Sequence, residues 1–429
     1  MAYLEFWGGV GVIGSSKVLI GDGGHRVLLD LGLDIPREAD LFRAPVQLRP
    51  AEELSARLRA GAAAAIPGIY DPAALAGAGD QLCDRLAAPA EPAALFVSHP
   101  HIDHVGLAGF VRPEIPVHAA PEAIALLDAL AATGDALPGP RDFSAPPTAW
   151  VPTETGTKVR VGPVTVERFD LDHDVPGASG YLVTTSDGVV AFTGDIRFHG
   201  LHPERSWAFA DAIANCDVLV TEGTALSFDE TRPLRTEADV ARDYGAALAA
   251  SRDLMLQAVY PRDLDRIRAL GKVAAELDRG IMWPPHTAAF LRAAGIDAAA
   301  TDLAIVRDNP GRYVVQVDPG DLPSLLDLPL GPGSAVLHAN GEPLGPFDPR
   351  WKVYTDWLAH RGLPLRQIGC SGHAYPDHLH EMVYRVRPKI VIPIHTMSPY
   401  RLHPVGGPAR VVVDYARRYD FAGRPVPGA

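Results

Sequence analysis

Short apolar runs separated by glycine and polar positions occupy the first half of the chain. They predict buried strands at 26–30, which ends on Asp30, and at 94–98, 164–168, 181–185, 189–193 and 218–221. Two intervening segments, 51–58 and 72–86, have helical spacing and are expected to cover one face of the sheet. The pattern predicts a layered α/β domain.

The pattern changes at about residue 228. Helical spacing follows at 237–250 and 264–277, and Pro- and Gly-rich segments such as 328–333 come next. After roughly Pro364 the alternation of strand, loop and helix returns. We therefore expect a first domain in two parts, residues 1–227 and 366–429, interrupted by an insert at 228–365.

A glycine motif near the N-terminus spells GxGxxG between Gly9 and Gly14. The dinucleotide-binding version of this motif opens a helix, whereas residues 15–20 here continue as a strand. We therefore interpret these residues as turn glycines and not as a nucleotide site.

The composition of the chain limits which residues could bind a metal and which partners the protein could have. The chain has 429 residues, and its three cysteines, Cys83, Cys216 and Cys370, are far apart, which indicates a reducing cytoplasm and leaves any metal to histidines and carboxylates. The N-terminus has no signal-peptide pattern and the apolar runs are too short to span a bilayer, so we expect a cytoplasmic protein with no membrane partner. A net charge of −13 disfavours passive binding to polyanions but is compatible with a local basic channel.

The clearest chemical signal is the loop His99-Pro-His101-Ile-Asp103-His104, which follows a predicted strand. His99 and His101 alternate and can share one metal, whereas Asp103 and His104 begin the next helix and can serve a neighbouring ion. Imidazole and carboxylate are ligands that suit zinc. A polar surface loop is the alternative, but this density of ligand-type residues favours a metal site.

Further ligands are expected at other strand ends. His173 follows the strand at 164–168, Asp195 follows the strand at 189–193, and His395 ends the apolar run at 390–394. Each could be an ordinary polar residue at the end of a strand. Together with the loop they supply a full ligand set for two ions.

These residues, with Asp30, resemble the five motifs of the metallo-β-lactamase fold. In addition, Glu222, the Ser371-Gly372-His373 turn and His395 resemble motifs A, B and C of the β-CASP subgroup, which includes ribonuclease J and the endonuclease of pre-mRNA 3′-end processing. The resemblance implies an αββα sandwich with an inserted β-CASP α/β cap domain.

The resemblance also implies roles for the individual residues. His99, His101 and His173 would bind one Zn²⁺, with Asp103, His104 and His395 on the second and Asp195 bridging both; Mn²⁺ is the alternative metal. A hydroxide held by the two zinc ions would attack phosphorus. Asp103, as a ligand of the second ion, would also be a catalytic residue. His373, oriented by Glu222, would be the general acid for the leaving group. Ser371, Gly372 and His373 would bind the substrate phosphate.

The expected substrate is RNA or single-stranded nucleic acid. However, the insert contains no basic run, so a hydrolase of a small or specialised substrate is a second hypothesis. A non-catalytic β-CASP scaffold is a third, which the complete ligand set disfavours. A homodimer fits the resemblance, but after His395 only residues 411–419 form a recognisable element where ribonuclease J has a dimerisation domain.

Overall fold

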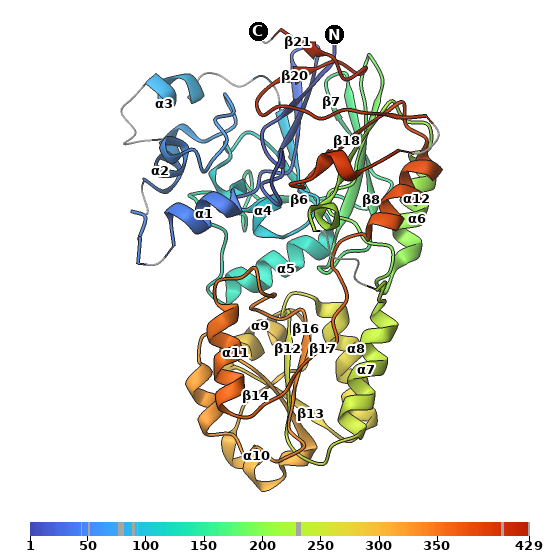
Figure 1. The fold of residues 1–429 in the computed structure, drawn as a ribbon. Helices are drawn as coiled ribbons and strands as arrows, with labels where there is room; N and C mark the ends of the chain where they lie inside the picture. The colour runs from blue at the N-terminus through green and yellow to red at the C-terminus, as the bar shows by residue number, and fades with distance from the viewer. Residues whose placement is uncertain are drawn as a thin grey trace.

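The computed structural model describes residues 1–43, 45–49, 52–75, 81–87, 91, 93–228, 233–404 and 407–427. These residues form two lobes, and both ends of the chain lie in the upper lobe of Figure 1. The upper lobe contains two sheets of eight and seven strands, and the lower lobe contains a sheet of six strands.

The two upper sheets are mixed. The eight-stranded sheet has the order β21 (Pro425–Val426), β20 (Arg418–Tyr419), β1 (Tyr3–Phe6), β2 (Val18–Asp22), β3 (His25–Leu29), β4 (Ala93–Phe96), β5 (Val117–Ala119), β6 (Trp150–Pro152). The seven-stranded sheet has the order β19 (Ala409–Arg410), β18 (Ile390–Ile394), β11 (Val218–Glu222), β10 (Val189–Phe192), β9 (Ser179–Thr184), β8 (Val164–Asp170), β7 (Lys158–Val161). The strands β10, β11 and β18 are parallel neighbours, so their carboxyl ends meet at one edge.

Alternation along the strands explains why the two sheets face each other. Val27 and Leu29 of β3 enter the core between the sheets, whereas Leu28 packs outward against helices. On the second sheet, Val190 and Phe192 point to the same central core and Ala191 points away from it. Both faces of each sheet are apolar, as expected for the inner layers of a four-layer sandwich.

Helices form the two outer layers. One side carries α1 (Ile35–Leu41), α2 (Glu53–Ala60), α3 (Gln81–Leu86), α4 (Ile102–Val105) and α5 (Pro121–Ala132), and the other side carries α6 (Pro203–Ala212) and α12 (Pro376–Val386). This arrangement is the αββα sandwich that the sequence predicted. The single helix expected at 72–86 is not observed as such: a 3₁₀ turn occupies Pro72–Leu75, residues 76–80 lie outside the described residues, and α3 follows.

The lower lobe is a parallel sheet between helices. Its strand order is β14 (Ala299–Ala300), β13 (Gly280–Trp283), β15 (Tyr313–Gln316), β12 (Met255–Val259), β16 (Val336–Ala339), β17 (Leu365–Gln367). The helices are α7 (Glu237–Ala249), α8 (Leu264–Glu276), α9 (Pro285–Ala293), α10 (Leu303–Asp308) and α11 (Trp351–His360). Both lobes thus have the α/β architecture expected from the sequence. No helix in the described ranges combines the length and apolar character that crossing a bilayer requires.

Candidate metal centre

The candidate centre lies where several strands of the two upper sheets end. β4 ends at Phe96, and the chain then turns through His99 and His101 into α4, whose first turn holds Asp103 and His104. His173, Asp195 and His395 follow β8, β10 and β18, respectively. The fold therefore brings together at one edge all seven residues predicted as ligands.

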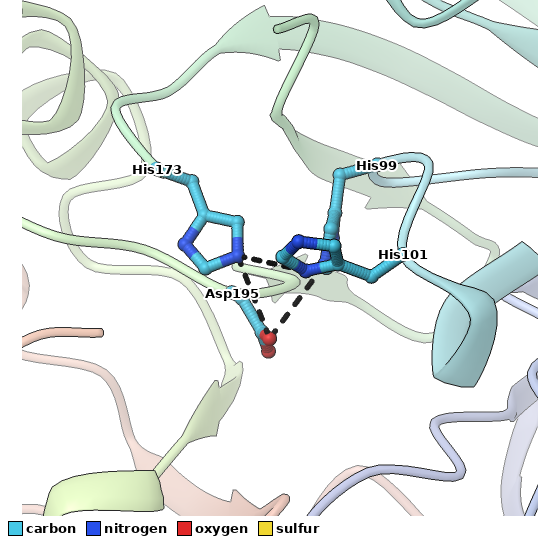
Figure 2. Close-up of side chains that lie close together, drawn as sticks. All are labelled: His99, His101, His173 and Asp195. Carbon is cyan, nitrogen blue, oxygen red and sulfur yellow. Dashed lines mark hydrogen bonds and ion pairs between the residues drawn. The ribbon is translucent and has the colours of Figure 1, made fainter. Parts of the chain in front are cut away.

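The first group contains His99, His101, His173 and Asp195, and Figure 2 shows their side chains converging. His99 Nε2 lies 3.0 Å from His101 Nδ1, which is 3.3 Å from His173 Nε2. Zn–N bonds of about 2.0–2.1 Å in a tetrahedral site place ligand atoms about 3.3 Å apart. The two nitrogen–nitrogen distances are close to this spacing, and the ligand atoms of all four residues lie within 4.8 Å of one another.

The second group contains Asp103, His104 and His395. His395 Nε2 lies 3.1 Å and His104 Nε2 lies 3.6 Å from Asp103 Oδ2. Asp195 Oδ2 lies between the two groups, 3.7 Å from His99 Nε2 and 3.3 Å from His104 Nε2. The carboxylate of Asp195 is therefore in position to bridge two ions.

Most of the candidate ligand histidines have a partner for the second ring nitrogen. His99 Nδ1 donates to Ser98 Oγ over 3.0 Å, and His104 Nδ1 donates to Asp30 Oδ2 over 2.7 Å. Such partners fix the tautomer and leave the other nitrogen free to bind metal. Asp30, which is part of the resemblance to the metallo-β-lactamase fold, thus orients the ring of His104 in the second group.

Two further partners come from distant segments. His395 Nδ1 lies 2.8 Å from Thr224 Oγ1, and His173 Nδ1 donates to the carbonyl oxygen of Gly372 over 2.6 Å. His395 also has a positive φ of 53°, an unusual conformation for a non-glycine residue, and its N–H donates to the Gly9 carbonyl oxygen over 2.7 Å. The N-terminal glycine loop thus supports this centre, and its following segment is strand β2 as the sequence predicted.

Unpaired polar atoms also fit bound ions. His104 Nε2 and Asp195 Oδ1 are buried and have no hydrogen-bond partner among the described residues. Leaving buried polar atoms unpaired destabilises a fold, so such atoms need an external partner. A donor set of imidazoles and carboxylates is one that suits zinc and manganese.

Burial and neighbouring charges shift the pKa values in the centre. Burial lowers the pKa of His101 to about 4 and, together with His104 and His173, lowers the pKa of His99 well below its usual range. These rings are therefore neutral, the form that binds metal. Burial opposes ionisation of Asp195, but the histidines around it, His395 and His104 foremost, lower its pKa.

His373 and Glu222 lie beside the bridging carboxylate. His373 Nδ1 is 3.6 Å from both Asp195 Oδ2 and Glu222 Oε1, and its side chain is 24% exposed. Burial lowers the pKa of His373, but Glu222, Asp195 and Asp174 outweigh this effect and raise it to about 10. Glu222 is fixed by the N–H groups of Thr224 and Ala374. The pair has the arrangement of an acid and its orienting carboxylate.

The Ser371-Gly372 turn is engaged in supporting contacts. Ser371 Oγ accepts from the His373 N–H over 3.0 Å, and the Ser371 carbonyl oxygen accepts from His199 Nε2 over 2.9 Å. The Gly372 carbonyl oxygen accepts from His173, as described above. Phosphate binding by Ser371 and Gly372 therefore stays a prediction, whereas the structure gives their carbonyl groups an orienting role.

Asp174 is a site residue that sequence reasoning did not assign. Its Oδ1 is buried without a hydrogen-bond partner among the described residues and lies 3.2 Å from His173 Nε2 and 3.6 Å from His101 Nε2. Burial raises its pKa, but His173 and His101 reverse this effect and the pKa is lowered. The two carboxylates that flank His173 in the sequence are a signal that could have identified it.

The other carboxylate beside His173 belongs to a buried charge network between the lobes. Arg197 Nε donates to Asp172 over 2.8 Å, and Arg197 Nη1 donates to Glu237 Oε1 of α7 over 2.8 Å. Glu237 Oε1 also accepts from Arg266 Nη2 of α8 over 2.6 Å. All four side chains are at most 3% exposed. The network joins the segments that carry His173 and Asp195 to two helices of the lower lobe.

Two further residues lie away from the centre's chemistry. His338 is buried on β16, and its Nε2 donates to the Pro343 carbonyl oxygen over 3.0 Å. Cys370 is buried and free, as is Cys216, whereas the side chain of Cys83 lies outside the described residues. His338 thus has a structural role, and Cys370 is a small buried residue.

The chain is similar to a known family model and to curated proteins. A family model described as Beta-lactamase superfamily domain matches residues 65–262. Ribonuclease J from Mycobacterium tuberculosis is 24% identical over 344 residues, which cover 70% of this chain and 58% of that protein. Ribonuclease J from Pyrococcus abyssi is 19% identical over 344 residues, covering 70% of this chain and 74% of that protein. The chain thus spans little more than half the length of its mycobacterial relative.

A solved structure shares the fold over nearly the whole chain. It is a protein of unknown function from Enterococcus faecalis V583, with a TM-score of 0.81 and 24% identity, and the match covers 97% of this chain and 99% of that one. The sandwich, the matched domain and the clustered histidines and aspartates agree with one another. The chain therefore has the metallo-β-lactamase fold and is similar in sequence to ribonuclease J.

Proposed function

We propose that the protein is a phosphodiesterase that cleaves RNA or single-stranded nucleic acid with two zinc ions, or alternatively manganese. The observation that carries the proposal is the convergence of seven ligand side chains in two adjacent groups, with Asp195 Oδ2 between them, next to the His373–Glu222 pair. Similarity to ribonuclease J over 70% of the chain supports the same substrate class.

In this proposal His99, His101 and His173 hold one ion, Asp103, His104 and His395 hold the other, and Asp195 bridges them. Bound zinc ions would lower the pKa of water to about 7 and neutralise charge on the phosphoryl oxygens. Asp103 keeps its carboxylate ionised beside His395, because the surrounding histidines outweigh burial and lower its pKa.

The protein's own residues would manage the leaving group. His373 lies 3.6 Å from Glu222 Oε1, which keeps the ring oriented, and the ring can give a proton to the departing oxygen. A positioned acid of this kind contributes roughly 10²- to 10⁴-fold to the rate. We propose that His373, with the adjoining Ser371-Gly372 turn, also contacts the substrate phosphate.

The domain assignment is part of the proposal. The strands of the lower sheet run from Met255 to Gln367, so a β-CASP cap inserted after β11 would end after Gln367 and include two residues more than the boundary at 365. The free, buried Cys216 and Cys370 are in keeping with action in the reducing cytoplasm.

A hydrolase of a small phosphodiester is the second candidate. A pocket lies between the two lobes, and its lining includes the three carboxylates Asp135, Asp318 and Glu342. A channel for long nucleic acid needs a positive lining instead. A non-catalytic scaffold is disfavoured because all seven ligand positions carry ligand-type residues.

Incubation of the zinc- or manganese-loaded protein with end-labelled RNA tests the proposal. His101→Ala should lose one metal and nearly all hydrolysis, whereas His373→Ala should retain both metals and lose rate. His25→Ala, in an exposed hairpin, is the control and should behave as wild type. Loss of metal in His373→Ala would mean that this residue is a ligand, and absence of RNA cleavage together with cleavage of another ester would refute the nuclease function.

A further inference from the structure

A pocket of about 220 Å³ lies between the two lobes. In the lower lobe, the pocket is lined by the segments that follow the parallel strands β12, β13 and β15. In the upper lobe, it is lined by the end of α5. Figure 1 shows α5 beside this end of the lower lobe. Ligands of parallel α/β sheets bind outside the carboxyl ends of the strands, so this location is suited to substrate binding.

The pocket adjoins the first metal group. Tyr260, the residue after β12, lines the pocket, and its ring centroid lies 5.8 Å from that of His101. A substrate held at the metal centre could therefore extend past Tyr260 into the pocket. An aromatic ring at this position also offers a surface on which a base can stack.

Arg262 is a basic residue of this pocket that has no counter-ion among the described residues. It is partly buried, and across the described ranges its guanidinium forms no hydrogen bond and no ion pair. The carboxylates in the same lining do have partners: Glu342 pairs with Arg350 at 2.8 Å, Asp135 with His286 at 3.8 Å, and Asp318 Oδ1 accepts from the Gly320 N–H at 2.8 Å. An unpaired guanidinium is a fork of donors that fits a phosphate.

We infer that Arg262 and Tyr260 form a subsite for one phosphate and its nucleoside next to the scissile bond. This inference rests on the proposed phosphodiesterase function. Because the subsite provides a single free cation among three carboxylates, it favours a short oligonucleotide over a long polyanion. The salt dependence of binding should correspondingly be shallow, with a slope near 0.7 for one phosphate contact on a single strand.

The test compares a substrate that fills the subsite with one that does not. Metal-loaded wild type, Arg262→Gln and Arg262→Lys are assayed with the trinucleotide UpUpU and with bis(p-nitrophenyl) phosphate, which has no flanking phosphate. In Arg262→Gln the ratio of kcat/KM for UpUpU to that for bis(p-nitrophenyl) phosphate should fall about 10- to 100-fold, the range for a charged hydrogen bond. The loss should be mainly in KM, and Arg262→Lys should recover part of it.

Arg268→Gln removes a positive charge from an exposed position of the same segment, where Arg268 pairs with Asp265 at 3.1 Å. The substrate ratio of this control should not change. If wild type cleaves UpUpU and the ratio in Arg262→Gln stays within about twofold of wild type, the subsite is refuted while the nuclease function stands. If wild type cleaves no oligonucleotide, the proposed function is wrong and the subsite fails with it.

Discussion

His173 and Gly372 are separated by 199 positions in the chain, yet His173 Nδ1 donates a 2.6 Å hydrogen bond to the Gly372 carbonyl oxygen. The bond fixes the His173 ring with Nε2 directed at the first metal group. The turn that carries the candidate acid His373 therefore also orients a candidate ligand, and changes in this turn should affect metal binding as well as catalysis.

Gly372→Ala should weaken metal binding. A Cβ at this position would lie 2.2 Å from Asp174 Oδ2, so either the turn or the carboxylate must move and the bond to His173 is disturbed. We expect about a 10- to 100-fold loss of metal affinity, the usual effect of losing such a supporting contact. Gly271→Ala in α8 is the control, because no atom lies within 4 Å of its added Cβ. Metal content after dialysis is the measurement, and retention of wild-type affinity would contradict the prediction.

Asp174→Asn should lower the affinity of the first metal group. The carboxylate lies 3.6 Å from His101 Nε2 and 3.2 Å from His173 Nε2, where its charge favours cation binding and orients His101. We expect about a 10- to 100-fold weaker site with the fold unchanged. Calorimetric metal titration measures it, with Asp211→Asn, an exposed carboxylate paired with Arg385, as the control. Equal affinities in Asp174→Asn and wild type would rule out this role.

Glu237→Gln should destabilise the junction of the two lobes. The substitution removes the charge of the carboxylate that Arg197 and Arg266 share, and leaves Asp172 as the partner of Arg197 and Asp263 as the partner of Arg266. Removing one partner of a buried ion pair costs roughly 3–5 kcal/mol, whereas an exposed pair contributes about 1 kcal/mol or less. Urea unfolding compares this variant with Arg242→Gln, whose exposed pair with Asp239 is the control. Similar small losses in the two variants would mean that the buried network contributes little.

Asp263→Asn should stabilise the protein at alkaline pH. Burial raises the pKa of Asp263 to about 7 against the opposing effects of Arg266 and Arg197, whereas the unfolded value is about 3.9. The folded state thus holds this proton more tightly, so its stability falls as pH rises from about 4 to 7 and then levels off. The variant avoids this loss, and its amide oxygen can still accept from the Arg266 N–H as Asp263 Oδ1 does.

Thermal unfolding at pH 5 and pH 8 measures the effect. The Tm of Asp263→Asn relative to wild type should be higher at pH 8 than at pH 5. Asp265→Asn, an exposed position on the same helix, should show no such difference between the two pH values. A Tm of Asp263→Asn that is lower than wild type at pH 8 would contradict the assignment.

Strands of the sandwich were predictable because their side chains alternate. Val27 and Leu29 face one core and Leu28 another, and this period of two is visible in the sequence. The segment 72–86 was predicted as one helix, but periodicity does not reveal where a short 3₁₀ turn replaces a helical one. Local patterns therefore identified most elements and misjudged a short irregular one.

Candidate ligands were predictable where their spacing is local. His99 to His104 lie within six positions on a loop after a strand, a pattern that has few explanations other than a metal site. Asp174, Tyr260 and Arg262 have no such spacing. The contact with His101 shows what Asp174 adds beyond flanking His173, and Arg262 stands out because no carboxylate pairs with it among the described residues. The significance of these residues depends on neighbours that are distant in the sequence.

By itself the sequence determined the type of chemistry and the layers of the fold, because ligand-type residues and apolar periodicity are properties of adjacent positions. Only the tertiary structure decided which groups meet. It placed the Gly372 carbonyl oxygen on His173, Asp195 between two histidine groups, and Glu237 between two arginines of different lobes. Such contacts form when distant segments pack, and their distances and burial set the charge states on which metal binding depends.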